Sequence, residues 1–484
     1  MNAAPESNAP ERLHPLVATL IVFLSNFCIL VLELVAGRIM APIVGVSLYT
    51  WTSIIGVILA GISLGNYLGG KIADRWASRT VLAGLFVLSA VGSASILGVV
   101  DLIDPLRALD LPVIVEVLLV FGAIFLLPST LLGTISPVVV KLTLADLKRT
   151  GDVVGKIYAA GAVGSIVGTF ATGFFLISAF GTRWIVWGVA GGLLLIGGLI
   201  GLGARRRLRY EVLALFVLFL ALSGLAWQQG WLISRCWQET NYYCIKVRID
   251  DKESNLRVLT LDRLVHSYVD LADPTRLRYG YEQVYATVLG AVFPDKPALA
   301  ALFIGGGGYT FPRYMEIVYP GSRIEVIEID PGVTRVAQAE LGLPLDTTIT
   351  TFNDFSVPYH LTTLEFNQQV AAHLTADGFY MVNIIDGRQG DFFRAYVHTL
   401  QQVFAYVYVS PVVAGLGEAE RQTYVIVASA HELPIHATPS GLDKQFVTAA
   451  ALAAYLQQGP RLTLTDDYVP VDNLLAPVFA AEGL

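Results

Sequence analysis

The sequence predicts two domains in succession: an α-helical polytopic membrane domain, and an α/β domain with a Rossmann-like parallel sheet. Two observations predict this fold class. The chain of 484 residues is 54% hydrophobic and only 15% charged, with a mean hydropathy of +0.61, whereas soluble proteins carry about 25% charged residues. The long apolar runs all precede residue 230, and a strand, a glycine run, a helix and a second strand follow later in the chain.

Seven apolar segments have about the 20 residues that a bilayer core requires. They are 16–36, 48–70, 80–100, 112–136, 157–180, 184–203 and 211–229. Beyond Gln229 no apolar run is long enough to cross. The first segment is too long for the apolar part of a signal peptide, so we expect it to be retained and the protein to be a multi-pass protein of the cell membrane.

Basic residues are distributed unevenly over the loops between these segments. The loops after the second, fourth and sixth segments carry most of the lysines and arginines, which predicts that these loops and the N-terminus are cytoplasmic. Seven crossings then leave the C-terminal domain on the non-cytoplasmic side. On that side Cys236 and Cys244 would be able to form a disulfide. Two ordinary cysteines at the start of a sheet are the alternative.

The main chemical signal reads LFIGGGGYTFPRYMEIVYPGSRIEVIEID and ends at Asp330. The apolar run Ala298–Ile304 predicts a buried strand, and Gly305–Gly308 form a turn in which backbone can approach a ligand closely. Glu328 follows Gly308 by about twenty positions, the spacing of an acid that accepts from ribose hydroxyls. The pattern favours nucleotide or nucleoside binding over a purely structural turn.

Several stretches resemble one known family. IGGGGYTFPRYM followed by IEVIEIDP resembles the adenosyl site of spermidine synthases and related class I methyltransferase-type folds. LTLDRLVHSYVDLADPTRLRYGYEQ resembles the region before this motif in spermidine synthases, and LTDDYVPVDNLLAP resembles the tail of membrane-fused relatives. The chain is similar to the membrane-fused spermidine synthase-like (polyamine aminopropyltransferase) family over most of residues 240–480.

The resemblance implies a set of site residues. They are Gly305, Gly306, Gly307, Gly308, Glu328 and Asp330 for the cofactor, His266, Tyr279 and Glu282 for the substrate, and Asp354 and Tyr281 for catalysis. An acid and a tyrosine suit this reaction because the attacking amine must lose a proton. For Asp354 the alternative is a turn or N-cap residue. The family's glycine loop reads GGGDG, and Gly308 and Tyr309 stand in place of its last two residues.

The resemblance implies aminopropyl transfer from decarboxylated S-adenosylmethionine to a polyamine or related amine. One alternative is a methyltransferase that uses S-adenosylmethionine on the same fold, which the missing loop aspartate favours. A second alternative is a polyamine transporter or sensor whose C-terminal domain only binds. We expect no metal, because no His/Cys cluster has ligand spacing. The net charge of −7 argues against nucleic acid, so the expected partners are an amine substrate and the lipid bilayer, with a homodimer left open.

The predicted domains are a cytoplasmic N-terminus at 1–15, membrane spans over 16–229, a β-rich lid at 230–295 and a nucleoside-binding domain at 296–484. The lid contains a hairpin over 242–262. The elements expected after Asp330 are a helix at 333–341, a strand at 347–352, a helix at 361–374, a strand at 379–385, a helix at 392–404, an antiparallel pair at 406–409 and 422–429, and a helix at 442–457.

One central strand of this fold has no counterpart in the sequence. The family places its fourth strand beside the glycine-loop strand, after a helix, but here Thr347–Phe352 runs directly into a loop that contains Asp354. A parallel neighbour requires a crossover of about a dozen residues or more, and no such crossover fits. We therefore predict a chain break between Thr351 and Phe355. A continuous chain would require residues 379–385 to pair directly with the glycine-loop strand.

Overall fold

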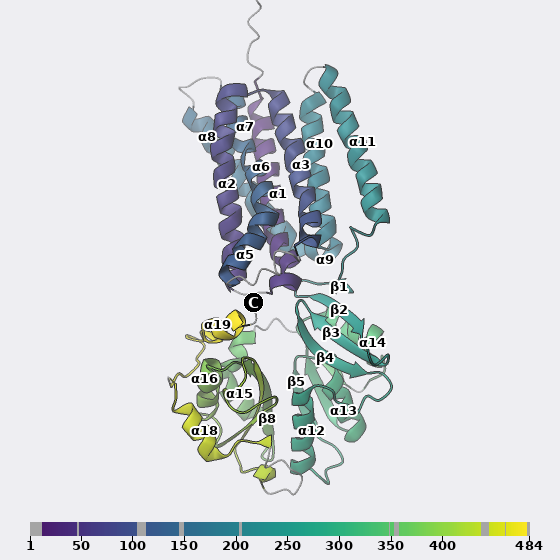
Figure 1. The fold of residues 1–484 in the computed structure, drawn as a ribbon, viewed down its shortest axis with the longest axis vertical. Helices are drawn as coiled ribbons and strands as arrows, with labels where there is room; N and C mark the ends of the chain where they lie inside the picture. Colours follow the sequence, from purple (N-terminus) through teal and green to yellow (C-terminus); the bar gives the residue numbers. More distant parts are fainter. Residues whose placement is uncertain are drawn as a thin grey trace, which may run out of the picture. The chain divides into compact units, whose positions relative to one another are not determined.

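A computed structural model describes residues 12–45, 48–103, 113–144, 150–202, 206–347, 349–352, 358–436, 445–459 and 461–481 (Figure 1). The chain divides into two units, Met1–Cys244 and Ile245–Leu484, which we name the membrane unit and the α/β unit. The division falls at the first residue of a strand, Cys244. The predicted order, helical domain first and α/β domain second, is confirmed.

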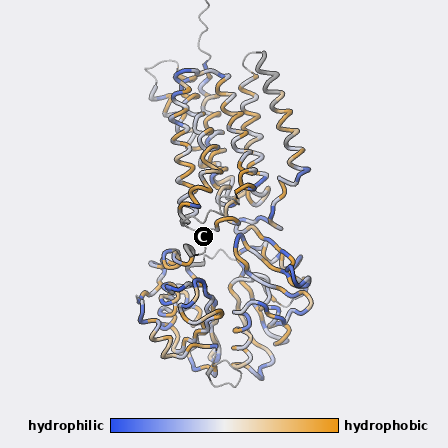
Figure 2. Tube along the Cα trace, in the orientation of Figure 1, coloured by the Kyte–Doolittle hydropathy of each residue, from blue (hydrophilic) through white to orange (hydrophobic). Residues whose placement is uncertain are grey.

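The membrane unit is built from apolar helices. Their bounds are α1 (Pro15–Val44), α2 (Leu48–Trp76), α3 (Arg79–Asp101), α5 (Val113–Phe121), η1 (Gly122–Leu126), α6 (Leu127–Gly133), α7 (Ile135–Thr143), α8 (Thr150–Ala171), η3 (Thr172–Leu176), α9 (Ile177–Phe180), α10 (Thr182–Leu202) and α11 (Arg206–Gln228). Figure 2 shows hydrophobic residues along their lengths. Among the described residues, 6 helical segments are long and apolar enough to cross a membrane, and they coincide with the first six predicted spans. The seventh prediction falls on α11, where the apolar stretch that the structure describes, Phe216–Gln228, is shorter.

Small residues let two of these helices touch. A Cβ atom added at Gly164 or Gly168 of α8 would overlap the carbonyl oxygens of Phe23 and Phe27 on α1. The two backbones are therefore in direct contact, as the glycine spacing of α8 predicts. In a bilayer, where helix association gains little from the hydrophobic effect, such close packing supplies much of the attraction.

The segment after α11, residues 229–244, which we name the exit segment, is fastened to the ends of three helices. Arg38 on α1 donates to the carbonyl oxygens of Thr240 (2.7 Å) and Tyr242 (2.6 Å). Asp101, at the end of α3, accepts from Arg183 near the start of α10 and from Arg235 in the exit segment. These helix ends and the exit segment therefore lie on one side of the membrane unit.

The α/β unit begins with a meander of three antiparallel strands, β2 (Cys244–Ile249), β3 (Leu256–Leu261) and β4 (Leu264–Asp270). The predicted hairpin is confirmed in β2 and β3, and β4 adds a strand that was not predicted. A two-residue strand, β1 (Gln238–Glu239), comes before β2 in the sheet order. The helix α12 (Gly280–Val292) then leads towards the glycine run.

Two further sheets follow, each with three strands. The first is parallel, with order β5-β6-β7, and the second is antiparallel, with order β8-β10-β9. Their strands are β5 (Ala300–Ile304), β6 (Arg323–Ile327), β7 (Thr350–Phe352), β8 (Phe379–Asp386), β9 (Tyr406–Pro411) and β10 (Gln422–Ser429), and the helices are α13 (Thr310–Val318), α14 (Pro331–Glu340), η4 (Pro358–Thr362), α15 (Leu364–His373), α16 (Asp391–Leu400), η5 (Pro434–His436), α18 (Ala449–Leu456) and α19 (Val471–Ala481). Every strand and helix predicted after residue 298 has a counterpart. The helix α19 was not predicted, and α16 ends four residues before the predicted end at Phe404 because a turn follows Leu400.

The two sheets do not join in the part of the chain that the structure describes (Figure 1). There, β5 pairs with β6 alone and β8 pairs with β10 alone. Direct pairing of residues 379–385 with the glycine-loop strand, the alternative to a chain break, is therefore not found among the described strands. The predicted break itself, and Asp354 with it, lies on residues 353–357, outside the described residues. On β5, Leu302 stays 56% exposed and Ile304 45%, so the predicted burial of this strand is wrong.

Candidate nucleoside and amine site

The glycine run forms a tight turn between β5 and α13. Gly305 has φ +95° and Gly307 has φ +50°, both in the left-handed region that favours glycine. Gly306 and Gly308 are limited by space instead, because an added Cβ would lie 2.6 Å from the ring of Tyr309 and 2.6 Å from the hydroxyl of Ser267. Each glycine of the run therefore has a steric or conformational reason to be there.

Glu328 lies just past the end of β6 and holds this turn. Its carboxylate accepts from the backbone N–H of Gly306 (2.7 Å) and of Asp330 (2.9 Å), and a further backbone bond comes from Gly307. Burial is the largest influence and raises the pKa of Glu328, while these hydrogen bonds oppose it. A carboxylate offers about four acceptor positions, so about one is left for a ligand hydroxyl.

Asp330 has a structural role at the start of the next helix. It is the N-cap of α14, and its carboxylate accepts from the backbone N–H of Gly332 at 2.8 Å. Such a cap satisfies one of the free donors at a helix start, and Asp330 is 1% exposed. Its contact with a cofactor stays a prediction, as do the ligand contacts of Glu328 and the glycines.

Tyr309 is a residue of this turn whose role the sequence did not reveal. It is fully buried, adopts φ +56°, and shares a hydrogen bond of 2.8 Å between its hydroxyl and that of Thr334. A non-glycine residue in this conformation costs roughly 1–2 kcal/mol, which the buried ring and its hydrogen bond offset. The signal in the sequence is that Tyr309 directly follows the glycine run and stands in place of the last glycine of the family's loop.

The strand β4 lies against the glycine turn. Ser267 shares a hydrogen bond of 2.7 Å with Thr310 at the start of α13, and the carbonyl oxygen of His266 lies 4.0 Å from a Cβ added at Gly307. The side chain of His266 is exposed to solvent, yet its surroundings desolvate the ring enough to lower its pKa. The structure thus brings a predicted substrate residue beside the predicted cofactor loop.

Three tyrosines continue from β4 along the start of α12. The ring centroids of Tyr279 and Tyr281 are 5.1 Å apart, and those of Tyr281 and Tyr285 are 5.4 Å apart. Tyr285 in turn contacts Phe311 of α13 edge to face at 5.4 Å. The aromatic series therefore connects the predicted amine-binding residues with the helix that follows the glycine loop.

Glu282 is enclosed among these tyrosines. It is 2% exposed, and its Oε2 atom has no hydrogen-bond partner. Burial raises the pKa of Glu282 to about 8, although the backbone of Tyr279 and the hydroxyl of Tyr281 favour the ionised form. Burial likewise raises the pKa of Tyr281. At neutral pH Glu282 therefore holds a proton, and a cation at its free oxygen would favour the carboxylate.

Asp386 is a second buried acid that the sequence did not single out. It ends β8, is 1% exposed, and accepts at 2.7 Å from the backbone N–H of Gly387 and of Phe393. Burial raises the pKa of Asp386 to about 6. The pattern IIDG, an acid between an apolar strand and a glycine, is the signal that marks it. Its carboxylate fixes the turn that leads into α16.

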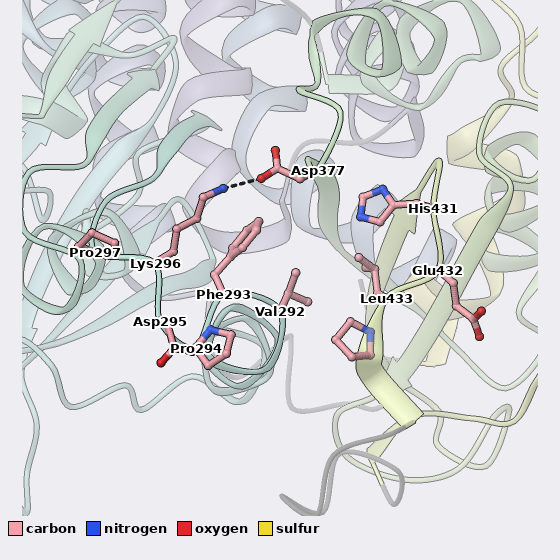
Figure 3. A pocket seen from close by; sticks show the side chains of 11 residues that line it. Val292, Phe293, Pro294, Asp295, Lys296, Pro297, Asp377, His431, Glu432 and Leu433 are labelled. Carbon is pink, nitrogen blue, oxygen red and sulfur yellow. Dashed lines mark hydrogen bonds and ion pairs between the residues drawn. The ribbon is translucent and has the colours of Figure 1, made fainter.

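A cavity of about 570 Å³ lies at the opposite ends of the strands (Figure 3). It is lined by Lys296 and Pro297, just before β5, by Asp377, just before β8, and by His431, just after β10. Lys296 reaches Asp377 across it at 2.5 Å. Nucleotide sites of such folds lie at the carboxyl ends of the strands.

The part of the chain that the structure describes contains no group of three or more His, Cys, Asp or Glu side chains able to hold a metal ion. The candidate site consists of backbone donors at the glycine turn, the acid Glu328, and the tyrosine–glutamate cluster of α12. These groups make the unit a candidate for the class of nucleoside-binding α/β proteins, with a predicted amine-binding region beside its loop. The expectation of a metal-free reaction stays a prediction.

Comparisons with known proteins agree with this class. No family model matches the chain. A probable polyamine aminopropyl transferase of Bifidobacterium longum is 28% identical over 143 residues, which cover 25% of this chain and 32% of that protein. A polyamine aminopropyltransferase of Vibrio vulnificus is 27% identical over 137 residues, 23% of this chain and 46% of that protein. The resemblance to polyamine aminopropyltransferases is confirmed for this part, and the chain spans less than half the length of these relatives.

Solved structures of spermidine synthases show a more distant likeness. A probable spermidine synthase from Corynebacterium glutamicum superposes with a TM-score of 0.43 and 19% identity, over 46% of this chain and 94% of that one. The spermidine synthase of Thermotoga maritima gives a TM-score of 0.37 and 16% identity, over 46% and 87% of the two chains.

Proposed function

We propose that the protein is a membrane-bound polyamine aminopropyltransferase that uses decarboxylated S-adenosylmethionine and an amine acceptor. The observation that carries the proposal is the contact between β4 and the glycine turn, because it brings His266 to the loop that is expected to hold the nucleoside. The names of the curated relatives support the same reaction class. The acceptor is expected to be a polyamine or a related amine.

The reaction joins the amine nitrogen to the methylene carbon next to the sulfonium. The nitrogen lone pair forms the C–N bond, the C–S bond breaks, and the sulfur keeps its electron pair as a neutral thioether. The nitrogen then loses a proton, for which Asp354 is the proposed acceptor, with the hydroxyl of Tyr281 as a proposed hydrogen-bond partner in the catalytic arrangement. Because the sulfonium leaves without further help, most of the rate would come from holding the two reactants in line.

A transfer assay on the purified full-length chain tests this proposal. The chain is supplied with decarboxylated S-adenosylmethionine and putrescine or spermidine, and with S-adenosylmethionine in a parallel reaction. We expect a longer polyamine and methylthioadenosine from the first reaction only. Methylated product and S-adenosylhomocysteine from the second reaction would establish the methyltransferase alternative instead.

A second candidate is a transporter or sensor whose α/β unit binds without turnover. The specific observation in its favour is the separation of β5 from β8, together with the interval of only five residues, 353–357, between β7 and η4. No helix and strand of ordinary length fit in that interval. Thermal stabilisation by amine or nucleoside, combined with no product in the transfer assay, would favour this candidate over the enzyme.

We also propose that the α/β unit faces the non-cytoplasmic side of the membrane. The basic loops support a cytoplasmic N-terminus. The exit segment lies at the far end of α1, since Arg38 binds the carbonyl oxygens of Thr240 and Tyr242 there. The Cys236–Cys244 disulfide supports an oxidising compartment on that side. With Cys28 replaced by serine, a cysteine introduced near Leu484 should react with an impermeant label on intact cells, and labelling only after lysis would contradict the orientation.

A further inference from the structure

A small cavity lies within the membrane unit, at the helix ends that hold the exit segment. Its volume is about 270 Å³, enough for a small polar group rather than a whole cofactor. It is lined by Phe180, Gly181, Arg183, Trp184, Trp227, Leu232, Ile233, Ser234 and Glu239. None of these residues is among those that the sequence singled out for function, and none belongs to the α/β unit.

One wall of the cavity is aromatic. Trp184 of α10 and Trp227 of α11 place their ring centroids 5.5 Å apart, and Phe180 at the end of α9 joins them. All three side chains are exposed. Tryptophans often lie at the membrane surface, and their ring faces also attract organic cations.

The cavity is also lined by a carboxylate, that of Glu239. Glu239 accepts from the backbone N–H of Thr182 at 2.7 Å and from the hydroxyl of Ser234. These two bonds fix its position and use about half of its acceptor positions. A Cβ at Gly181 would lie 3.6 Å from Glu239, so the absence of a side chain there leaves the carboxylate accessible from the cavity.

The arginines nearby are already paired. Arg183 gives its guanidinium to Asp101 at 2.7 Å and to the carbonyl oxygen of Trp231 at 2.7 Å. Arg235 lies against the same Asp101 and does not line the cavity. Among the described residues no lysine or arginine forms an ion pair with Glu239. The cavity therefore combines exposed aromatic faces with a carboxylate that forms no ion pair with a described lysine or arginine, while Arg183 and Arg235 share Asp101.

We propose that this cavity binds an organic ammonium group, with the cation against Glu239 and its methylene groups on the two tryptophans. A free polyamine and the headgroup of phosphatidylethanolamine present the same chemistry, and either would place one ammonium in it. The proposal concerns the membrane unit alone, so it does not depend on catalysis by the α/β unit.

The experiment uses tryptophan fluorescence of the full-length chain in dodecyl maltoside, which contains no amine. All 7 tryptophans precede Cys244, so the signal reports on the membrane unit and not on an amine site in the α/β unit. We expect spermidine to change the fluorescence saturably. Glu239→Gln should weaken this binding on the order of tenfold, and Trp227→Leu about three- to tenfold.

Trp231→Phe is the matched control, because Trp231 is an exposed tryptophan of the exit segment, close to Trp227 in the sequence, that does not line the cavity. It should leave the affinity within about twofold. Trp227→Leu keeps the test valid if Glu239→Gln fails to fold. No saturable change with spermidine, or equal affinities for Trp227→Leu and Trp231→Phe, would overturn the proposal.

A second arm distinguishes the two sources of the ammonium group. Micelles doped with phosphatidylethanolamine are compared with micelles doped with diacylglycerol, which lacks the amine. If the headgroup occupies the cavity, the first lipid should raise the apparent Kd for spermidine and the second should not. Equal values for both lipids, with saturable spermidine binding, assign the cavity to the free amine.

Discussion

One strand from each three-stranded sheet of the α/β unit, β10 and β5, shows how differently the two sheets are covered. In the sheet β8-β10-β9, the strand β10 is paired on both sides, and the residues Tyr424 to Ala428 have no exposure. In the sheet β5-β6-β7, the strand β5 carries the glycine turn but is paired on one side only, and Leu302 and Ile304 are exposed. The candidate site thus stands on the less covered of the two sheets.

This difference shows which part of the α/β unit depends on a strand beside the open side of β5. The β10 sheet has its own core with α16 and α18, around Phe393, Tyr396 and Leu452. The glycine turn is held by local hydrogen bonds of Glu328 and by β4, which do not require a strand on the open side of β5. We therefore expect the nucleoside to bind even if the catalytic arrangement, which depends on residues 353–357, does not form.

Hydrogen exchange should give the largest contrast between the two strands. Amides of β5 that point to its open side have no strand partner in the described part of the chain, whereas those of β10 lie between two strands. We expect a difference in exchange rate on the order of a thousandfold, measured by mass spectrometry on peptides from 300–304 and 422–429. Equal protection would mean that another segment covers β5.

Truncation of a core residue should separate the sheets by stability. Ile426→Ala removes a fully buried side chain from β10 and should cost about 2–5 kcal/mol. Leu302→Ala on β5 should cost less than about 1 kcal/mol, because Leu302 is already 56% exposed. Thermal unfolding of the two variants measures the loss of stability in each. A loss with Leu302→Ala as large as with Ile426→Ala would show that β5 is buried.

The ligand contact of the glycine turn should depend on one carboxylate. Glu328→Gln should weaken binding of an adenosyl ligand by about 1–3 kcal/mol, the value of a charge-assisted hydrogen bond, and isothermal titration measures the Kd. Glu325→Gln is the control, since Glu325 lies on the same strand and pairs with Arg323 at 2.5 Å. An unchanged Kd for Glu328→Gln would mean that the carboxylate only holds the turn.

A further prediction concerns the pH dependence of stability. The pKa of Glu282 is raised from 4.5 to about 8 in the folded protein. Between these values the unfolded chain loses a proton that the folded chain keeps, so this residue lowers stability as the pH rises. The slope is at most about 1.4 kcal/mol per pH unit and vanishes above the folded pKa.

The variant Glu282→Gln lacks this proton and should gain stability relative to the native chain as the pH is raised from 5 to about 8. The apparent Tm of the two proteins over this range is the measurement. Glu432→Gln, which changes an exposed glutamate, is the control and should show no such trend. A constant difference in Tm between Glu282→Gln and the native chain would show that Glu282 is ionised throughout.

The sequence by itself determined the class of each half. Apolar segments of bilayer length identify the membrane unit, because a membrane imposes a length and a composition that any stretch of sequence reveals. The order of strands and helices after residue 298 was also correct. These features depend on short-range periodicity and turn chemistry, which neighbouring residues alone decide.

Other features depend on contacts between distant residues, and only the tertiary structure decided them. The burial of Glu282 depends on the packing of α12, and the position of Tyr309 depends on Thr334 on α14. Likewise, Glu239 faces a cavity because Thr182 and Ser234 hold it there. The desolvation of a carboxyl and the enclosure of a cavity are properties of what surrounds a residue in space, and residue type and spacing along the chain do not contain them.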